Sequence, residues 1–435
     1  MTRRRRRTFL STRTAIAQIR FVALGLYSFR AAARNVRDIP RGSLENVTEP
    51  AKVLVAGAGI GGLSAAIALR RAGFEVAVLE RASELGVVGA GLLLAANAQK
   101  ALGRLGLAQQ VATLGTPASA FEMRSWRGRV LTGNPAGELE KKVGSPSVAV
   151  HRADLQALLI REAGEGTLRL GAEVEGFEQD EAGVTVYTSG GGEERADLLV
   201  GADGLRSRVR ASLFGPARPR YAGYTAWRAV VEPEEELLPW GTGFESWGRG
   251  ARFGCAHIGG GRIYWFATAN APEGKKDGHP GSPGGPKATL LRRFGTWHNP
   301  IGNLIGAADE NAILRTDIYD REPLGGRWGR GRVTLLGDAA HPMTPDLGQG
   351  AAQALEDTVV LARCLQESGA TADALRRYER LRSARAAMVV RRSRRLGRVG
   401  QLENPLLCRL RNRALAMTPP KAQLRQLEEV MGYEP

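Results

Sequence analysis

The stretch Gly57-Ala58-Gly59-Ile60-Gly61-Gly62 decides the fold of this 435-residue chain. The apolar run Val53–Ala56 before it predicts a buried strand, and the pattern of Leu63–Leu69 after it predicts a helix. A second apolar run, Val76–Leu79, ends in the acid Glu80. A strand, a glycine turn, a helix, a strand and an acid in this order form the βαβ unit that holds an adenine dinucleotide.

Each part of this unit has a physical task. Gly57 permits the tight turn, Gly59 lets the backbone approach a pyrophosphate, and Gly62 lets the helix pack against the strand. The helix N-terminus offers free N–H groups and a partial positive charge to the phosphates. Glu80 can accept hydrogen bonds from the adenosine ribose. The unit alone leaves NAD, NADP and FAD open, and a glycine-rich turn in another α/β fold is the alternative.

Length and cysteine usage limit the protein class. The chain is long enough for two or three domains, and no run approaches the roughly 20 apolar residues of a membrane-spanning helix. Cys255, Cys364 and Cys408 lie far apart and lack metal-ligand spacing. We therefore expect no transmembrane segment, no metal site and three thiols in a reducing compartment.

The net charge of +17 is unevenly distributed along the chain. Residues 1–37 contain ten arginines and no acid, which leaves +7 on the rest. A second cluster at 376–398 holds ten arginines and the single acid Glu379. Neither cluster carries a nucleic-acid-binding motif. We interpret them as a basic extension and a solvated basic helix that steers anionic ligands, with no nucleic acid partner.

Residues 1–50 form a basic segment that differs from the rest of the chain. Arg6–Leu10 resembles a twin-arginine export signal, but Arg20 and Arg30 interrupt the apolar region that should follow. An arginine-rich, acid-poor start also fits an organelle transit peptide, and a disordered tail is the third possibility. We expect a cytoplasmic protein, with export or an organelle as alternatives.

Patterning divides the remainder into three parts. Residues 51–180 and 325–365 predict a split dinucleotide-binding domain, to which the element at 197–210 belongs. Residues 215–325 contain aromatic-rich strand patterns between turns, which predict an antiparallel sheet. Residues 366–435 predict C-terminal helices.

Three further segments carry chemistry. Gly201–Arg210 and Gly337–Pro342 each follow a predicted strand, and Pro345–Gly350 runs into a predicted helix. An Asp at the carboxyl end of a parallel strand lies where ligands bind. Asp203 and Asp338 can therefore accept hydrogen bonds from sugar or polyol hydroxyls, or each can be a turn or N-cap residue.

In combination these segments resemble the FAD-dependent monooxygenases of the p-hydroxybenzoate hydroxylase fold, over roughly residues 51–400. Tyr221–Arg228 and Met343–Gly350 are similar to the subgroup of salicylate hydroxylase, zeaxanthin epoxidase and FAD-dependent urate hydroxylase. The resemblance implies an α/β fold with a Rossmann-like FAD-binding domain, an antiparallel substrate sheet and C-terminal helices.

The resemblance also implies roles for residues. Glu80 would bind the adenosine ribose, and Arg152 would contact the ribityl–pyrophosphate region. Asp203 would support the pyrophosphate and the use of NAD(P)H, Asp338 would bind the ribityl hydroxyls, and Pro345 would flank the isoalloxazine ring. The implied FAD-binding set is Gly57, Gly59, Gly61, Gly62, Glu80, Arg81, Arg152, Asp203, Asp338, Gly348, Gly350 and Ala351.

By the same resemblance, NADH or NADPH reduces FAD, O2 adds as a flavin hydroperoxide, and one oxygen atom passes to a small aromatic or isoprenoid-like substrate. Tyr224, Arg228 and Pro345 form the candidate catalytic set, although Arg228 could equally form an ordinary salt bridge. His341 is a candidate base, with a structural role as the favoured alternative. From the residues alone, a helix starting near Gly350 would stabilise the negative charge of reduced flavin.

Two other functions stay open. A flavin-dependent reductase or dehydrogenase could use the same fold, and the basic charge would suit a protein that binds nucleic acid or a membrane surface. A monomer and a homodimer are both compatible with the sequence.

Overall fold

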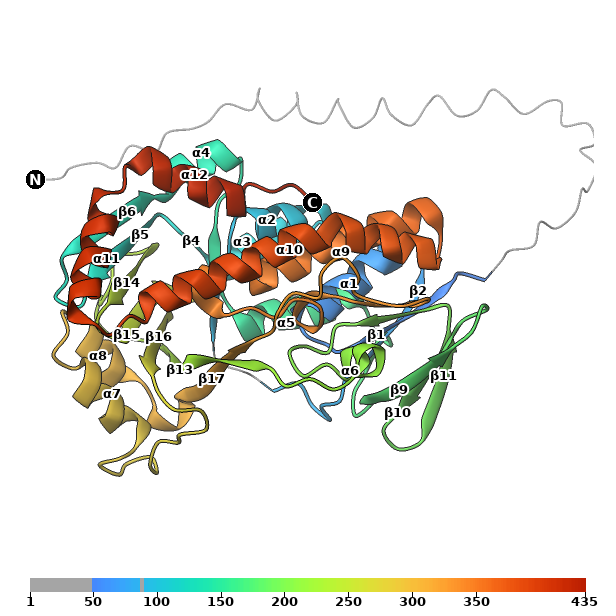
Figure 1. Ribbon diagram of the computed structural model, residues 1–435, viewed down its shortest axis with the longest axis horizontal. Coiled ribbons are helices and arrows are strands. Elements are labelled where there is room, and N and C mark those ends of the chain that lie inside the picture. The colour runs from blue at the N-terminus through green and yellow to red at the C-terminus, as the bar shows by residue number, and fades with distance from the viewer. Residues whose placement is uncertain (1–48, 87–89) are drawn as a thin grey trace, which may run out of the picture. The chain divides into compact units, whose positions relative to one another are not determined.

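A five-stranded parallel sheet carries the glycine turn (Figure 1). The computed structural model describes residues 49–86 and 90–435, and 50–435 form one unit. The predicted extension and part of the glycine-rich segment after Gly86 lie outside the described residues. The strand order is β18-β12-β1-β2-β8, and all neighbours run parallel. The strands are β1 (Lys52–Ala56), β2 (Glu75–Leu79), β8 (Leu168–Arg169), β12 (Leu198–Gly201) and β18 (Val333–Leu335).

Other elements cover this sheet because its strands are apolar on both faces, as in Val53, Leu54 and Val55, which are fully buried. Helix α1 packs against α5 and α9, and α9 packs against α2. A small antiparallel sheet, β9 to β11, contacts β1 and β12. The elements are α1 (Ile60–Arg71), α2 (Ala96–Arg104), α3 (Ala108–Leu114), α4 (Ala136–Val143), α5 (Arg152–Ala163), α6 (Arg208–Phe214), α9 (Gly350–Ser368), β3 (Gly91–Leu94), β4 (Thr116–Pro117), β7 (Val148–His151), β9 (Val174–Gln179), β10 (Val184–Thr188) and β11 (Gly192–Ala196).

The predicted substrate sheet has seven strands in the order β17-β13-β16-β15-β14-β5-β6. Its strands within 215–325 pair antiparallel, as expected. Two further strands, β5 and β6, come from the segment that was expected in the FAD-binding domain. Because β5 pairs parallel with β14, the sheet is mixed and not wholly antiparallel. The elements are β5 (Ala120–Ser125), β6 (Val130–Pro135), β13 (Arg220–Val231), β14 (Thr242–Trp247), β15 (Ala251–His257), β16 (Ile263–Asn270), β17 (Leu314–Asp320), α7 (Pro286–Phe294) and α8 (Ile301–Ala307).

The C-terminal segment is helical, as predicted, with α10 (Ala372–Gly400), α11 (Pro405–Met417) and α12 (Pro420–Met431). Thr371 caps α10 by accepting from the Ala374 N–H. The expectation of a solvated basic helix is wrong for one side of α10, because Arg382 is fully buried against α9. In the described part of the chain, no helix combines the length and apolarity needed to cross a bilayer.

Candidate active site

The glycine turn has the geometry that a pyrophosphate needs. Gly57 has φ of +100°, and a Cβ there would lie 2.6 Å from the Ala202 carbonyl oxygen. A Cβ on Gly62 would lie 1.9 Å from the Gly57 carbonyl oxygen, so only glycine allows α1 to start this close to β1. A Cβ on Gly59 would meet no atom within 4 Å. The backbone at Gly59 therefore faces open space that a ligand can fill.

Gly61 joins three segments that lie far apart in the sequence. A Cβ at Gly61 would lie 2.8 Å from the Leu336 side chain and 3.2 Å from the Ala354 Cβ. A Cβ at Gly337 would approach the same Ala354 atom at 3.1 Å. The starts of α1 and α9 and the end of β18 therefore meet at one point, which brings the predicted FAD-binding segments together.

Glu80 lies beside the glycine turn. Its Oε2 accepts from the Ala58 N–H at 2.7 Å, and its Oε1 accepts from the Ala82 N–H at 3.0 Å. Each carboxylate oxygen keeps a lone pair for a further donor, as a ribose hydroxyl requires. Arg81, next in the chain, has an exposed side chain.

Asp203 has the capping role that the sequence left open, and one of its carboxylate oxygens stays free for a further donor. Its Oδ2 caps α6 by accepting from the N–H groups of Arg208 at 2.7 Å and Val209 at 3.2 Å. Its buried Oδ1 has no partner in the described part of the chain. Desolvation raises the pKa of Asp203, although hydrogen bonds from Ser207 and the backbone oppose this shift. A free acceptor can serve a phosphate only through a donor such as water, so the geometry favours a water-mediated contact.

Asp338 lies in the 3₁₀ turn after β18, with its carboxylate exposed. Surrounding protein atoms raise its pKa by desolvation, which His341 and Arg152 oppose through their charges. The Asp338 Oδ1 lies 3.8 Å from the position of a Cβ on Gly350, the first residue of α9. An accessible carboxylate beside a helix N-terminus fits a hydroxyl-bearing chain that continues into a ring. Arg152, at the start of α5, is exposed nearby.

The loop before α9 presents Pro345 and Gly348 to solvent and buries Asp346. Gly348 has φ of +62°, the left-handed conformation that glycine adopts at low cost. Gly350 and Ala351 follow in the first turn of α9. Exposed backbone with small side chains is suited to lie against a planar ring.

A buried ionic network holds this loop. The Tyr224 hydroxyl donates to Asp346 Oδ2 at 2.9 Å, and Arg252 donates to Asp346 Oδ1 at 2.5 Å and Glu245 at 3.0 Å. The side chains of Asp346 and Arg252 are 0% and 3% exposed. Burial and the Asp346 charge raise the pKa of Tyr224, so its hydroxyl remains a donor. Tyr224 thus bonds to the loop support, and its ring is buried.

A second buried network, which the sequence analysis missed, holds the turn after β18. His341 Nε2 lies 2.6 Å from Asp357 Oδ2, which also accepts from the Gly337 N–H at 3.0 Å. Arg382 of α10 bonds to Asp357 at 2.7 Å and Glu356 at 2.5 Å. Burial would raise the pKa of Asp357, but His341 and Arg382 together lower it. His341 has a structural partner and is buried, in line with its structural alternative.

Alternation along β13 separates the two faces of the large sheet. Trp227, Ala229 and Val231 pack into the core that includes α7 and α8. Arg228 points to the opposite face, which it shares with Tyr224, and pairs with Phe266 of β16. Burial raises the pKa of Tyr264, and the neighbouring Arg228 opposes this. Arg228 also donates to the Thr316 hydroxyl at 2.7 Å. In the described part of the chain it has no carboxylate partner.

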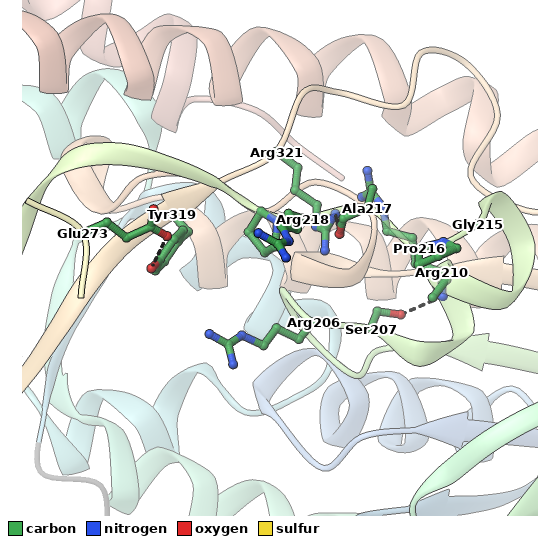
Figure 2. Close-up of a pocket in the computed structure, with 12 residues that line it drawn as sticks. Arg206, Ser207, Arg210, Gly215, Pro216, Ala217, Arg218, Glu273, Tyr319 and Arg321 are labelled. Atoms are coloured by element: carbon green, nitrogen blue, oxygen red, sulfur yellow. Dashed lines mark hydrogen bonds between the residues drawn. The ribbon is translucent and has the colours of Figure 1, made fainter.

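A cavity of about 380 Å³ lies beside α6, and its lining includes Arg206, Arg210, Arg218 and Arg321. Figure 2 shows these side chains. Arg210 and Arg321 donate to backbone carbonyls, and Arg206 and Arg218 are exposed. No ion pair to any of the four occurs within residues 49–86 and 90–435. Desolvation, with the Arg321 charge, lowers the pKa of Arg210 to about 10. Glu273 also lines this cavity and accepts from the Tyr319 hydroxyl, so the four arginines outnumber the one acid and the lining has an excess of positive charge.

Among residues 49–86 and 90–435, no group of three or more His, Cys, Asp or Glu side chains could hold a metal ion. All three cysteines are free and buried.

Comparisons with known proteins identify the family. A family model described as an FAD binding domain matches residues 50–230 and 315–393, more than half of the chain. Aurachin C monooxygenase/isomerase from Stigmatella aurantiaca is 47% identical over 365 residues, which cover 84% of this chain and 94% of the relative. FAD-dependent urate hydroxylase from Klebsiella pneumoniae is 37% identical over 346 residues, which cover 79% and 88%.

Solved structures agree with this assignment. The Klebsiella pneumoniae protein HpxO, complexed with FAD and uric acid, has a TM-score of 0.82 and 33% identity, covering 88% of this chain and 96% of that one. A salicylate hydroxylase substrate complex, 24% identical, shares the fold with a TM-score of 0.69 over 89% and 99% of the two chains. This chain belongs to the FAD-dependent monooxygenases of the p-hydroxybenzoate hydroxylase fold, which hydroxylate or epoxidise small organic substrates.

Proposed function

We propose that this monooxygenase acts on a planar, oxygen-bearing ring that Arg228, Tyr264 and Phe266 hold on the large sheet. Relatives of the chain include a urate hydroxylase, 3-amino-4-hydroxybenzoate 2-monooxygenase and 6-hydroxynicotinate 3-monooxygenase, whose named substrates are oxygenated rings. An arginine between aromatic side chains suits such a ligand, because it can donate to a carbonyl or carboxylate while the rings stack.

The observation that carries this proposal is the face of β13. Arg228 lies on the same face as Tyr224, whose hydroxyl reaches Asp346 in the loop at Pro345. A Cβ on Gly91 of β3 would lie 2.4 Å from the Tyr264 ring, so the β3 backbone packs on this ring. The face with Arg228 therefore lies next to the elements proposed to hold FAD.

The chain's own residues would bind and orient the reactants. We propose that the glycine turn and Glu80 hold the adenosine end of FAD, Asp338 the ribityl chain, and the backbone at 348–351 the ring. When bound, FAD supplies the electron transfer and oxygen activation. Arg228 would fix the substrate orientation, and Pro345 would limit water access to the reacting side of the ring.

Substitution of Arg228 tests the substrate site. A screen of NAD(P)H oxidation with aromatic acids, purines and isoprenoids, read by mass for one added oxygen, identifies the substrate. For an anionic substrate, Arg228→Gln should raise KM about tenfold or more, and Arg228→Lys should retain part of the affinity. Arg249→Gln, at an exposed turn between β14 and β15, is the control. Equal KM values for the Gln variant and the control would contradict the proposal.

We also propose that the arginine cavity binds the phosphates of the nicotinamide coenzyme, with NADPH preferred. Its four guanidinium groups without carboxylate partners suit a dianionic 2′-phosphate. Arg206→Gln and Arg218→Gln should raise KM for NADPH more than KM for NADH, because only NADPH carries that phosphate. Equal effects on both coenzymes would contradict the preference.

Three broader inferences accompany these proposals. The buried free thiols support a reducing, cytoplasmic location, and the protein would act as a monomer or homodimer. O2 is the proposed co-substrate. A reductase or dehydrogenase is the alternative activity, and O2 consumption coupled to substrate distinguishes the two.

A further inference from the structure

Helix α11 has its apolar side facing outward. Leu406, Leu410 and Met417 are 65%, 63% and 68% exposed, and their spacing with Arg413 places them on one stripe of the helix. Leu407 adds a further 47% exposed side chain. A helix that packs only on its own protein usually buries this stripe.

The inward side of the same helix is polar. Arg411 is 7% exposed and donates to the carbonyl oxygens of Gly400 and Gly248 at 3.1 and 3.0 Å. Its guanidinium also lies 5.0 Å from the centre of the Trp247 ring. Cys408, the other inward residue, donates to the Leu402 carbonyl. These contacts fix the rotation of α11, so the exposed leucines are a consequence of specific bonds.

The hairpin between β5 and β6 extends this surface. Helix α11 contacts β6, and the two lie side by side at one end of the unit formed by residues 50–435 (Figure 1). The backbone N–H of Trp126 donates to the backbone carbonyl of Trp247, the residue on whose ring Arg411 stacks. Trp126 and Val130 are 36% and 48% exposed. The outer face of α11 and this hairpin therefore form one surface with aliphatic and tryptophan side chains.

Unpaired cations surround these apolar groups. Arg409 and Arg413 are exposed on α11, and Arg127 and Arg129 are exposed on the hairpin. None of the four forms an ion pair within the described ranges. Exposed leucines and a tryptophan among free arginines are typical of segments that lie in the interface of an anionic bilayer.

We propose that the outer face of α11, with the β5–β6 hairpin, docks this enzyme on an anionic membrane surface. Charge argues against other occupants. A two-fold contact through this face would place the exposed arginines of both copies in one interface, which like-charge repulsion disfavours. Residues 1–37 carry ten arginines and no acid, so they are a poor cover for this face. Anionic lipid headgroups complement it.

Vesicle flotation of the full-length, FAD-loaded protein tests the proposal. Vesicles of phosphatidylcholine with phosphatidylglycerol should bind the protein, vesicles of phosphatidylcholine alone should bind it much less, and added salt should weaken binding. The double variant Leu406→Ser/Leu410→Ser should lose about tenfold or more in partitioning. Arg409→Gln/Arg413→Gln should lose about fivefold per arginine at low salt.

Leu381→Gln is the matched control, because Leu381 is a 45% exposed leucine on α10 outside this face. All variants should keep their bound flavin and their NAD(P)H oxidation rate without vesicles, which shows that they fold. The proposal is overturned if the full chain does not bind the anionic vesicles, or if the leucine variant binds as the control does. It is also overturned if the parent is a dimer that the leucine variant splits into monomers.

Discussion

Replacing Asp346 with Asn tests whether the buried network supports the flavin loop. The substitution keeps the shape of the side chain and removes its charge. It leaves Arg252, which is 3% exposed, with Glu245 as its remaining carboxylate at 3.0 Å. It also changes the acceptor of the Tyr224 hydroxyl at 2.9 Å. The loop that contains Pro345 and Gly348 loses a charged attachment to the large sheet.

The expected loss of unfolding free energy follows from burial. Removing one partner of a buried ion pair costs about 3–5 kcal/mol, because the remaining charge stays desolvated. Since Arg252 keeps Glu245, we expect Asp346→Asn to lie at the lower end, about 3 kcal/mol. Tyr224→Phe removes one hydrogen bond to a charged group and should cost about 1.5 kcal/mol.

Urea unfolding of the FAD-free protein measures these losses. Glu322→Gln is the control, because Glu322 is 71% exposed in its pair with Arg220 and should contribute at most about 1 kcal/mol. A cycle of Arg252→Met and Asp346→Asn should show a coupling of about 2 kcal/mol. The loosened loop should also divert more NAD(P)H oxidation to H2O2. A stability loss equal to that of the control, with no coupling, would refute the reasoning.

Three further predictions concern the cofactor site and its support. Gly62→Ala places a Cβ 1.9 Å from the Gly57 carbonyl oxygen and should abolish flavin retention, as absorbance spectra would show. Gly59→Ala places a Cβ with no atom within 4 Å, so this variant should fold and only bind FAD more weakly in a titration. Asp338→Asn should weaken FAD binding and raise the melting temperature of the FAD-free protein at neutral pH. The pKa of Asp338 is higher in the folded state than in the unfolded chain, so the folded state loses stability as this carboxyl ionises with rising pH. The Asn side chain does not ionise and avoids this loss. An unchanged melting temperature would contradict this. Arg382→Gln should cost about 3–5 kcal/mol at neutral pH in urea unfolding. The deficit should shrink on acidification, because the lowered pKa of Asp357 contributes stability above its unfolded value and loses it as pH falls. A pH-independent deficit would argue against this network.

Local sequence predicted the elements well where one short segment contains all the needed information. The order of strand, glycine turn, helix, strand and acid at 53–80 is such a segment, because chain geometry forces its ends together. The sequence pattern of the C-terminal segment likewise predicted the helix α10. The mixed pairing of the large sheet did not, because β5 lies far from β14 in sequence and its half-buried residues give a weak strand pattern.

The supporting networks show the same limit. Asp346 and Arg252 are separated by 94 residues, and Arg382 looked like one more arginine of a solvated helix. Pairing of charges across the core depends on which side of α10 faces α9, and a run of arginines on every side of a helix does not reveal this. A signal in the sequence was the pair of adjacent acids Glu356 and Asp357 between the apolar positions Leu355 and Val359 of α9.

The sequence alone determined the dinucleotide turn and the class of fold, and the resemblance of its combined motifs to a known family implied FAD. Those features depend on backbone conformation and short-range spacing, which neighbouring residues control. The tertiary structure decided that Asp203 both caps α6 and keeps one free oxygen, that Tyr224 supports the loop, and that α11 turns its leucines outward. Each depends on how distant segments pack and on which buried polar groups find partners, and that is a property of the assembled core.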